Sequence, residues 1–291
     1  MMISIVIPVY NTEQELFQLH KRILEELCNK YIFEIVFIYD EGSKKSWEVI
    51  KYIAEIDPEH VRAFQLDSNY GQQNATLYGL KMARGTYIIT MDDDYQHNPK
   101  YIPEMVEKME NENFDIIYGK YRKNKQLYFK FFLSRILNCL LCFFIPKLPR
   151  NYSSYRLIKK ELVNSIQGKY SSFLQIDVEL GSLSPKIGSI IIEHFPSLRN
   201  ESSYSFKILF YKVVDVLFGY SIRFNVLFNF LLLLGLISFI GFIIIHFVNF
   251  KGQLFSVILI ISIMFCMILI KIGSMRRIRQ KLIPSTKNKI N

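Results

Sequence analysis

YIITMDDDYQ, residues 87–96, is an apolar run of strand type that ends in three consecutive carboxylates. Carboxylates crowded in this way repel one another unless a cation lies between them, and Mg²⁺ or Mn²⁺ takes oxygen ligands while bridging phosphates. Residues i and i+2 of an extended chain share a face, so Asp92 and Asp94 can converge on one ion while Asp93 points away. The alternative is a solvated acidic turn after an edge strand, and the surrounding sequence has to decide between the two.

Around this run, segments of strand type alternate with segments of helix type. The alternation predicts an α/β fold with a doubly wound, mostly parallel sheet and helices on both faces. Ligands of such sheets bind beyond the carboxyl ends of the strands. The expected strands are residues 3–9, 33–39, 61–66, 87–91 and 114–118, and the expected helices are residues 13–29, 44–56, 72–84 and 101–111.

Polar clusters fall at three of these carboxyl ends, namely residues 8–11, 40–43 and 92–94. The sequence has neither a G-x-G-x-x-G fingerprint after the first strand nor a G-x-x-x-x-G-K-[ST] loop, so a metal ion would have to hold any phosphates. A nucleoside diphosphate fits this arrangement. Asp40 would accept hydrogen bonds from the base or the ribose, and an ion at Asp92 and Asp94 would bridge the diphosphate.

Four motifs together resemble the family 2 inverting glycosyltransferases of GT-A fold, and their order and spacing are most similar to the polyprenyl-phosphate branch. They are P-x-Y-N at 8–11, D-E-G-S at 40–43, N-Y-G-Q at 69–72 with Ala75 and Gly79, and M-D-D-D-Y-Q-H-x-P at 91–99. The resemblance covers residues 3–225, and Glu41 departs from it where the family usually has a second aspartate. It implies that Asp92, Asp94 and Gln96 hold Mg²⁺ or Mn²⁺. It also implies a nucleotide site made of Pro8, Tyr10, Asn11, Asp40 and Gly71.

Further cations indicate an acceptor that carries phosphate. Residues 127–145 are apolar except for a narrow polar stripe, which predicts an interfacial amphipathic helix at about 126–146; a buried core helix with a solvated stripe is the alternative. The family resemblance implies that four arginines line the acceptor side, where the planar guanidinium suits phosphate. Taken alone, each of them fits an ordinary surface arginine. They are Arg122, Arg135, Arg156 and Arg199.

The end of the chain predicts a membrane anchor. Residues 226–248 and 254–272 are nearly free of charge and long enough to cross a bilayer core of about 30 Å, so we expect a hairpin of two transmembrane helices. Lysines and arginines flank the pair on both sides, which places both termini in the cytoplasm at the inner (plasma) membrane. The expected domains are a catalytic domain at 1–225, the hairpin at 226–275 and a basic cytoplasmic tail at 276–291. Residues 3–9 are too short for the apolar core of a signal peptide and serve better as a strand.

The predicted function is transfer of a sugar from a nucleotide sugar to polyprenyl (undecaprenyl) phosphate on the cytoplasmic face. Such an acceptor is largely dianionic at pH 7 and needs no protein base. One alternative acceptor is a hydroxyl of a lipid-linked glycan, for which Asp177 in FLQIDVEL (173–180) would be the catalytic base. A catalytically silent membrane scaffold is the other alternative. The net charge of +10 indicates adhesion to anionic lipid and not nucleic-acid binding. The sequence leaves open whether the protein forms a homo-oligomer.

Overall fold

A computed structural model describes most of residues 1–193 and several segments C-terminal to them. The described residues are 1–121, 139, 141–149, 151–166, 175–193, 213–214, 216–248, 268 and 286–290. The predicted sites at Arg122, Arg135 and Arg199 lie outside them, as do most of the predicted interfacial helix and, apart from Ile268, the second predicted span.

An eight-stranded sheet forms the centre of the described part of the chain, in the order β7-β5-β6-β4-β1-β2-β3-β8. Every strand runs parallel to its neighbours except β6 and β8, which are antiparallel to theirs. The long apolar run of β1 is buried at seven consecutive positions, as expected for a parallel strand covered on both faces. The strands are β1 (Met2–Val9), β2 (Ile32–Tyr39), β3 (Val61–Leu66), β4 (Tyr87–Thr90), β5 (Ile116–Tyr121), β6 (Arg156–Lys159), β7 (Ile187–Ile192) and β8 (Thr286–Ile290).

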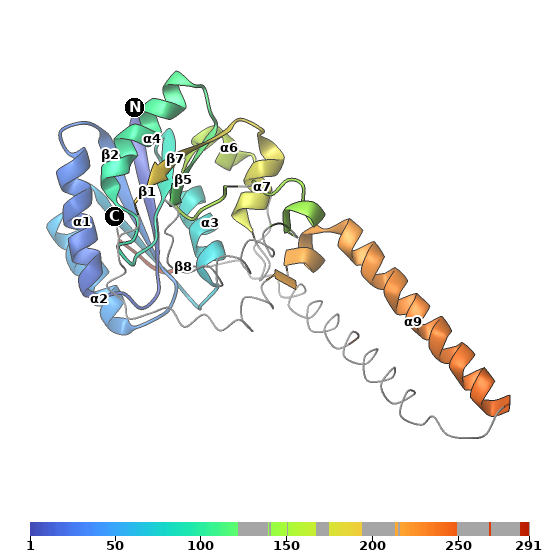
Figure 1. Cartoon of the computed structure of the whole chain (residues 1–291). Helices are drawn as coiled ribbons and strands as arrows, with labels where there is room; N and C mark the ends of the chain where they lie inside the picture. Colours follow the sequence, from blue (N-terminus) through green and yellow to red (C-terminus); the bar gives the residue numbers. More distant parts are fainter. Residues whose placement is uncertain are drawn as a thin grey trace.

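Helices pack on both faces of this sheet and enclose two separate apolar cores (Figure 1). One face carries α1 (Gln14–Leu27), α2 (Lys44–Ile56) and α4 (Ile102–Asn111), the last preceded by a 3₁₀ turn at Pro99–Tyr101. The other carries α3 (Gln72–Met82), α6 (Lys160–Asn164) and α7 (Ile176–Leu183). Helix α3 lies so close to the sheet that a Cβ at Gly79 would come within 2.4 Å of Val6 Cγ1. The predicted doubly wound, mostly parallel sheet is therefore confirmed.

Helix α9 (Ile222–Val248) projects away from the sheet domain (Figure 1). Its base is held by a third apolar cluster, which joins residues before the helix to α7 and to residues 141–148. Ser221 Oγ also donates to the carbonyl oxygen of Phe144 at 2.8 Å. Within the part of the chain whose side chains are described, no helix combines the length and the hydropathy that a bilayer span requires.

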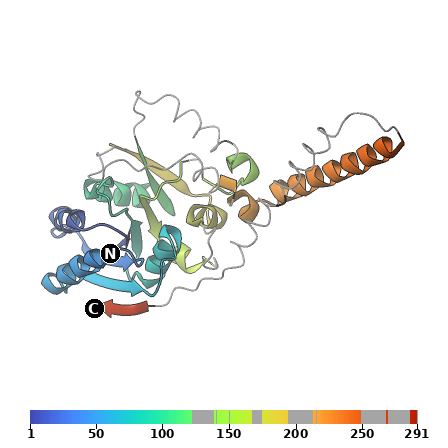
Figure 2. The same cartoon turned by 90° about the horizontal axis from the view of Figure 1, so that it is seen from below.

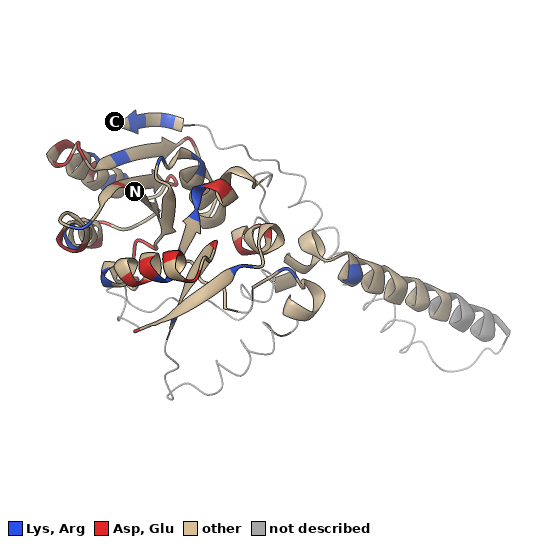
Figure 3. Cartoon of the chain, turned by 90° about the horizontal axis from the view of Figure 1, so that it is seen from above, with Lys and Arg blue, Asp and Glu red and all other residues tan. Residues whose placement is uncertain are grey.

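Part of the predicted basic tail at 276–291 belongs to the sheet. Residues Thr286–Ile290 form β8, which runs along the outer edge of β3 (Figure 2). The sequence T-K-N-K-I has only one large apolar side chain, so its composition suggests a solvated tail. Charged lysines are nevertheless common on edge strands, where they discourage further pairing, and Figure 3 shows them along β8.

Candidate active site

The ends of β1, β2 and β4 meet at one edge of the sheet, as the sequence predicts. The backbone N–H of Asp40 donates to the carbonyl of Val9 at 2.8 Å, and that of Ser43 donates to Asn11 Oδ1 at 2.7 Å. Gly42 lies so close to the first loop that a Cβ there would stand 1.7 Å from the carbonyl oxygen of Tyr10. Only glycine allows this approach between the two loops.

The residues predicted to bind the nucleotide surround the end of β2. Pro8 is buried within β1, paired with Ile38, while Tyr10 at the end of that strand is 48% exposed. Asp40 is buried, and its Oδ1 accepts the backbone N–H of Tyr70 at 2.7 Å. Gly71 follows with φ of 81°, a conformation that glycine adopts without strain and that turns the chain into α3. The structure therefore brings Asp40 and Gly71 to the same loop cluster.

Burial dominates the electrostatics of Asp40. It raises the pKa of this carboxyl group from 3.8 to about 6, because the charged form is poorly solvated, and the backbone N–H groups of Tyr70 and Gly71 oppose that rise. Asp40 is thus a carboxylate near neutral pH that lacks full solvation. A ligand N–H or O–H would supply the hydrogen bond that water does not.

The strand β4 ends at Thr90 and the chain turns at Asp93 and Asp94, so the three consecutive carboxylates make different contacts. Asp93 is turned toward the first loop, where its Oδ2 accepts from Thr12 Oγ1 at 2.5 Å and from the Tyr10 N–H at 3.4 Å. Asp92 and Asp94 both raise the pKa of Tyr121, after the larger effect of its burial, so both lie within electrostatic range of one hydroxyl. Among the described residues, no group of three His, Cys, Asp or Glu side chains could hold a metal ion.

A pair of carboxylates still fits Mg²⁺ or Mn²⁺. These ions commonly take one or two carboxylates and complete their coordination with substrate phosphate and water. Asp92, Asp94 and Gln96 are all half-buried and supply hard oxygen ligands. Asp94 Oδ1 accepts the backbone N–H of Gln96 at 3.1 Å, which keeps these two residues in one tight turn.

Asp92 is held by residues to which the sequence assigned no role. Gln72 Nε2 donates to its Oδ1 at 2.6 Å, and Ser154 Oγ donates to its Oδ2 at 2.7 Å. The backbone N–H of Asp92 donates to Nδ1 of His97, a buried ring stacked on Tyr155 at 4.8 Å. Gln72 and His97 lie inside recognised motifs, whereas Ser154 becomes visible only once β6 is placed beside β4.

Arg156 and Asp177 are both predicted from the sequence to serve an acceptor, but the structure pairs them with each other. Arg156 Nη1 donates to Asp177 Oδ1, and both side chains are buried, at 1% and 2% exposure. Tyr118 donates its hydroxyl to the same oxygen at 2.9 Å, and Arg156 Nε donates to Thr90 Oγ1 at 3.1 Å. In this arrangement each side chain is the buried ionic partner of the other.

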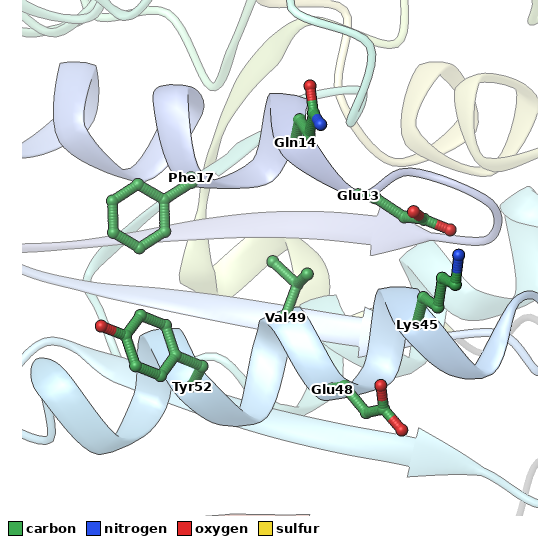
Figure 4. A pocket seen from close by; sticks show the side chains of 7 residues that line it. All are labelled: Glu13, Gln14, Phe17, Lys45, Glu48, Val49 and Tyr52. Atoms are coloured by element: carbon green, nitrogen blue, oxygen red, sulfur yellow. The ribbon is translucent and has the colours of Figure 1, made fainter.

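A pocket of about 460 Å³ lies elsewhere, between α1 and α2 (Figure 4). The rings of Phe17 and Tyr52 point toward each other across it and stack at 6.1 Å. The carboxylates of residues 92–94 do not line it, so we do not assign it to the candidate active site.

The fold and the carboxylates at one edge of its sheet are those of a glycosyltransferase domain, and the comparisons agree. The family model "Glycosyl transferase family 2" matches residues 4–175. The chain belongs to glycosyl transferase family 2, which bears out the resemblance found in the sequence.

Relatives and solved structures extend this result. An undecaprenyl-phosphate 4-deoxy-4-formamido-L-arabinose transferase of Enterobacter sp. (strain 638) is 30% identical over 218 residues, 74% of this chain and 66% of the relative. The chain thus spans slightly less than two thirds of that relative's length. Mannosyl-3-phosphoglycerate synthase from Rubrobacter xylanophilus shares the fold, with a TM-score of 0.59 at 16% identity over 75% of this chain and 73% of that one. Glucosyl-3-phosphoglycerate synthase from Mycobacterium tuberculosis, in complex with Mn²⁺, UDP and glucosyl-3-phosphoglycerate, has a TM-score of 0.52 at 16% identity over 74% and 77% of the two chains.

Proposed function

We propose that this protein transfers a sugar from a nucleotide sugar to a polyprenyl phosphate at the inner membrane. The arrangement of Asp40, Asp92 and Asp94 at one edge of a family 2 domain carries the donor half of the proposal. The relatives support the acceptor half, because their names give undecaprenyl phosphate as the acceptor.

On the donor side, Asp40 would accept a hydrogen bond from the base or the ribose. Pro8, Tyr10, Asn11 and Gly71 would complete the nucleotide site. Asp92, Asp94 and Gln96 would hold Mg²⁺ or Mn²⁺, which when bound would stabilise the charge of the departing diphosphate. Gln72 and Ser154 fix the Asp92 carboxylate before the donor arrives, so little reorganisation is needed on binding.

The buried Arg156–Asp177 pair favours an acceptor that is already ionised. A hydroxyl acceptor needs a base, and the candidate base Asp177 is bound to a guanidinium and a phenol. A phosphate monoester with a second pKa near ~6 is largely a dianion at pH 7, so it can attack the anomeric carbon without losing a proton to the protein. The attack would come from the side opposite the nucleotide and invert that carbon.

We further propose that α9 is the first helix of a membrane hairpin. Its 27 residues at ~1.5 Å each span about 40 Å, more than the ~30 Å of a bilayer core. Apolar side chains along its first half are exposed, with Ile222 at 81%, Val226 at 62% and Phe230 at 55%. Strand β8 also supports a hairpin, because it returns the chain to the sheet from which α9 departs. The acceptor arginines Arg122, Arg135 and Arg199 remain predictions.

The decisive experiment is product analysis. Purified protein is incubated with undecaprenyl phosphate, Mn²⁺ and a panel of nucleotide sugars, and the extracted lipids are measured by mass spectrometry. We expect the lipid to gain one sugar through a phosphodiester with one or more of the donors. Transfer to a lipid-linked oligosaccharide but not to undecaprenyl phosphate would contradict the proposal. If the nucleotide sugar is consumed and neither acceptor gains a sugar, the protein only hydrolyses the donor, and the proposal is again contradicted.

A further inference from the structure

The outer edge of β3 is covered by a strand from the far end of the sequence. Strand β8 pairs Ile290 with Ala63, Lys289 with Phe64 and Asn288 with Gln65, and the register then shifts so that Thr286 pairs with Leu66. Lys287 is the extra residue at this irregularity. β8 is thus an edge strand with a defined register.

Side chains reinforce the backbone pairing. Asn288 Nδ2 donates to Gln65 Oε1 at 2.6 Å, and Lys289 Nζ lies 5.7 Å from the centre of the Phe64 ring. Ile290 packs against the apolar core formed with α1, α2 and α4. Without β8, one side of β3 would present unpaired backbone N–H and C=O groups to solvent.

The segment directly after β3 is part of the candidate donor site. We call residues 67–71 the donor loop. Leu66, the last residue paired with β8, is followed by these five residues and then by Gln72, which begins α3. Within this short connection the Tyr70 N–H bonds Asp40, and directly after it Gln72 bonds Asp92.

We propose that β8 orders the donor loop, so that docking of this strand on β3 is required for full donor affinity. A five-residue connection has little freedom when both ends are fixed, and considerably more when the end of β3 frays. The contact of the Tyr70 N–H with Asp40 depends on that fixed end. The part of this proposal that concerns donor affinity rests on the proposed function, whereas the ordering of the loop does not.

Hydrogen exchange measured by mass spectrometry tests the ordering directly. The full chain and a variant lacking residues 286–291 are compared in the same detergent. We expect amides of the donor loop to exchange about tenfold faster in the deletion variant, while β5 stays unchanged as the internal reference. The exchange rates of the β3 amides do not test the proposal, because deletion of β8 removes their hydrogen-bond partners whether or not the donor loop changes. A peptide of sequence PSTKNKIN (residues 284–291) should restore slow exchange, and a scrambled peptide should not.

Two substitutions in β8 test whether the strand must pack against the sheet or need only be present in the chain. Ile290→Asp removes the packing against the core and should reproduce the deletion, whereas Lys287→Ala at the register shift should leave exchange unchanged. UDP with Mn²⁺, titrated by calorimetry, should bind about tenfold more weakly to Ile290→Asp than to Lys287→Ala, since loop disorder lowers the fraction of competent protein.

The outcomes are distinguishable. If the donor loop keeps its slow exchange in the deletion variant and in Ile290→Asp after β3 has lost protection, the proposal is overturned. If the loop becomes mobile but UDP affinity does not change, the link to donor binding is overturned. If UDP with Mn²⁺ does not bind the full chain at all, the donor assignment fails, and the exchange data alone decide the ordering role.

Discussion

At the scale of single residues, Asp92 is held from several directions in the candidate site. Hydrogen bonds from Gln72, from Ser154 and from its own backbone N–H to His97 fix its position. Asp94, by contrast, accepts a local hydrogen bond from the backbone of Gln96, two residues further along the chain. If these carboxylates hold a metal ion as proposed, Asp92 would set its place and Asp94 would adjust to it.

Replacement of either carboxylate should remove metal-dependent donor binding. We expect Asp92→Asn and Asp94→Asn to slow transfer by at least ~10²-fold, because the diphosphate loses its electrostatic partner. Calorimetry with UDP should show affinity that no longer rises with Mn²⁺. Asp93→Asn is the matched control: its amide oxygen can still accept from Thr12, so the Mn²⁺ dependence should persist. Wild-type Mn²⁺ dependence in Asp92→Asn would show that the ion lies elsewhere.

The raised pKa of Asp40 predicts a pH dependence for nucleoside binding. Its folded-state pKa is about 6, so the free protein loses the carboxylate form as the pH falls below that value. A base that donates a hydrogen bond to Asp40 prefers the carboxylate, so affinity should fall below about pH 6, by at most ~tenfold per pH unit. Uridine is a suitable probe because it has no phosphate that titrates in this range. Asp40→Asn should bind weakly at every pH, whereas a wild-type affinity that is flat from pH 5 to 8 would exclude this role.

At the scale of elements, the Arg156–Asp177 pair joins β6 to α7 beneath the candidate site. A buried charge left without its partner is costly, so Asp177→Asn and Arg156→Met alone should each lower the free energy of unfolding by about 3–5 kcal/mol. The double variant Arg156→Met/Asp177→Leu leaves no unpaired charge and should recover part of that loss. The free energy of unfolding of each variant can be measured by urea denaturation, with the fluorescence of Trp47 as the signal.

The single variant Asp177→Asn also tests which acceptor the enzyme uses. If the acceptor is a phosphate, Asp177→Asn should transfer sugar at a near wild-type rate once the rate is divided by the folded fraction. A hydroxyl acceptor would instead lose a base, at a cost of typically ~10²- to 10⁴-fold. A loss of that size in folded Asp177→Asn protein would return Asp177 to the role of catalytic base.

The sequence predicts the helices and strands that have a strong local hydrophobic pattern. It does not predict the strands that form only because they pair with a neighbouring strand. The continuous apolar runs of β1 and β2 and the periodicity of α2 locate them within about a residue. β6 has only four residues, and β8 is mostly polar, so each is a strand only because of its neighbour. The same limit applies to the site. Asp40, Asp92 and Asp94 follow from their places at strand ends, whereas Ser154 and the partner of Arg156 require the position of β6.

At the scale of the whole molecule, two connections join the segments around the apolar helix α9 to the sheet domain. Tyr220, just before α9, accepts the N–H of Gln175 at 3.0 Å, and Gln73 Oε1 accepts the N–H of Ile176 at 3.2 Å. Because Gln72 on the same helix binds Asp92, the base of α9 is linked to the candidate metal site through α7 and α3. Strand β8 is the second connection, at the edge of the sheet formed by β3.

These two connections require that the chain leave the sheet domain and come back to it, which predicts a topology that can be measured. If the apolar segments cross the membrane, they must do so an even number of times, because β8 and the base of α9 belong to one domain. We expect Gly252→Cys, in a background with the four native cysteines changed to serine, to react with a membrane-impermeant maleimide on intact cells. Ser285→Cys, just before β8, should react only after the membrane is permeabilised. Labelling of Ser285→Cys on intact cells would require β8 to lie across the membrane from β3. Such a result would contradict both the hairpin and the pairing, since a strand cannot join a sheet through a bilayer.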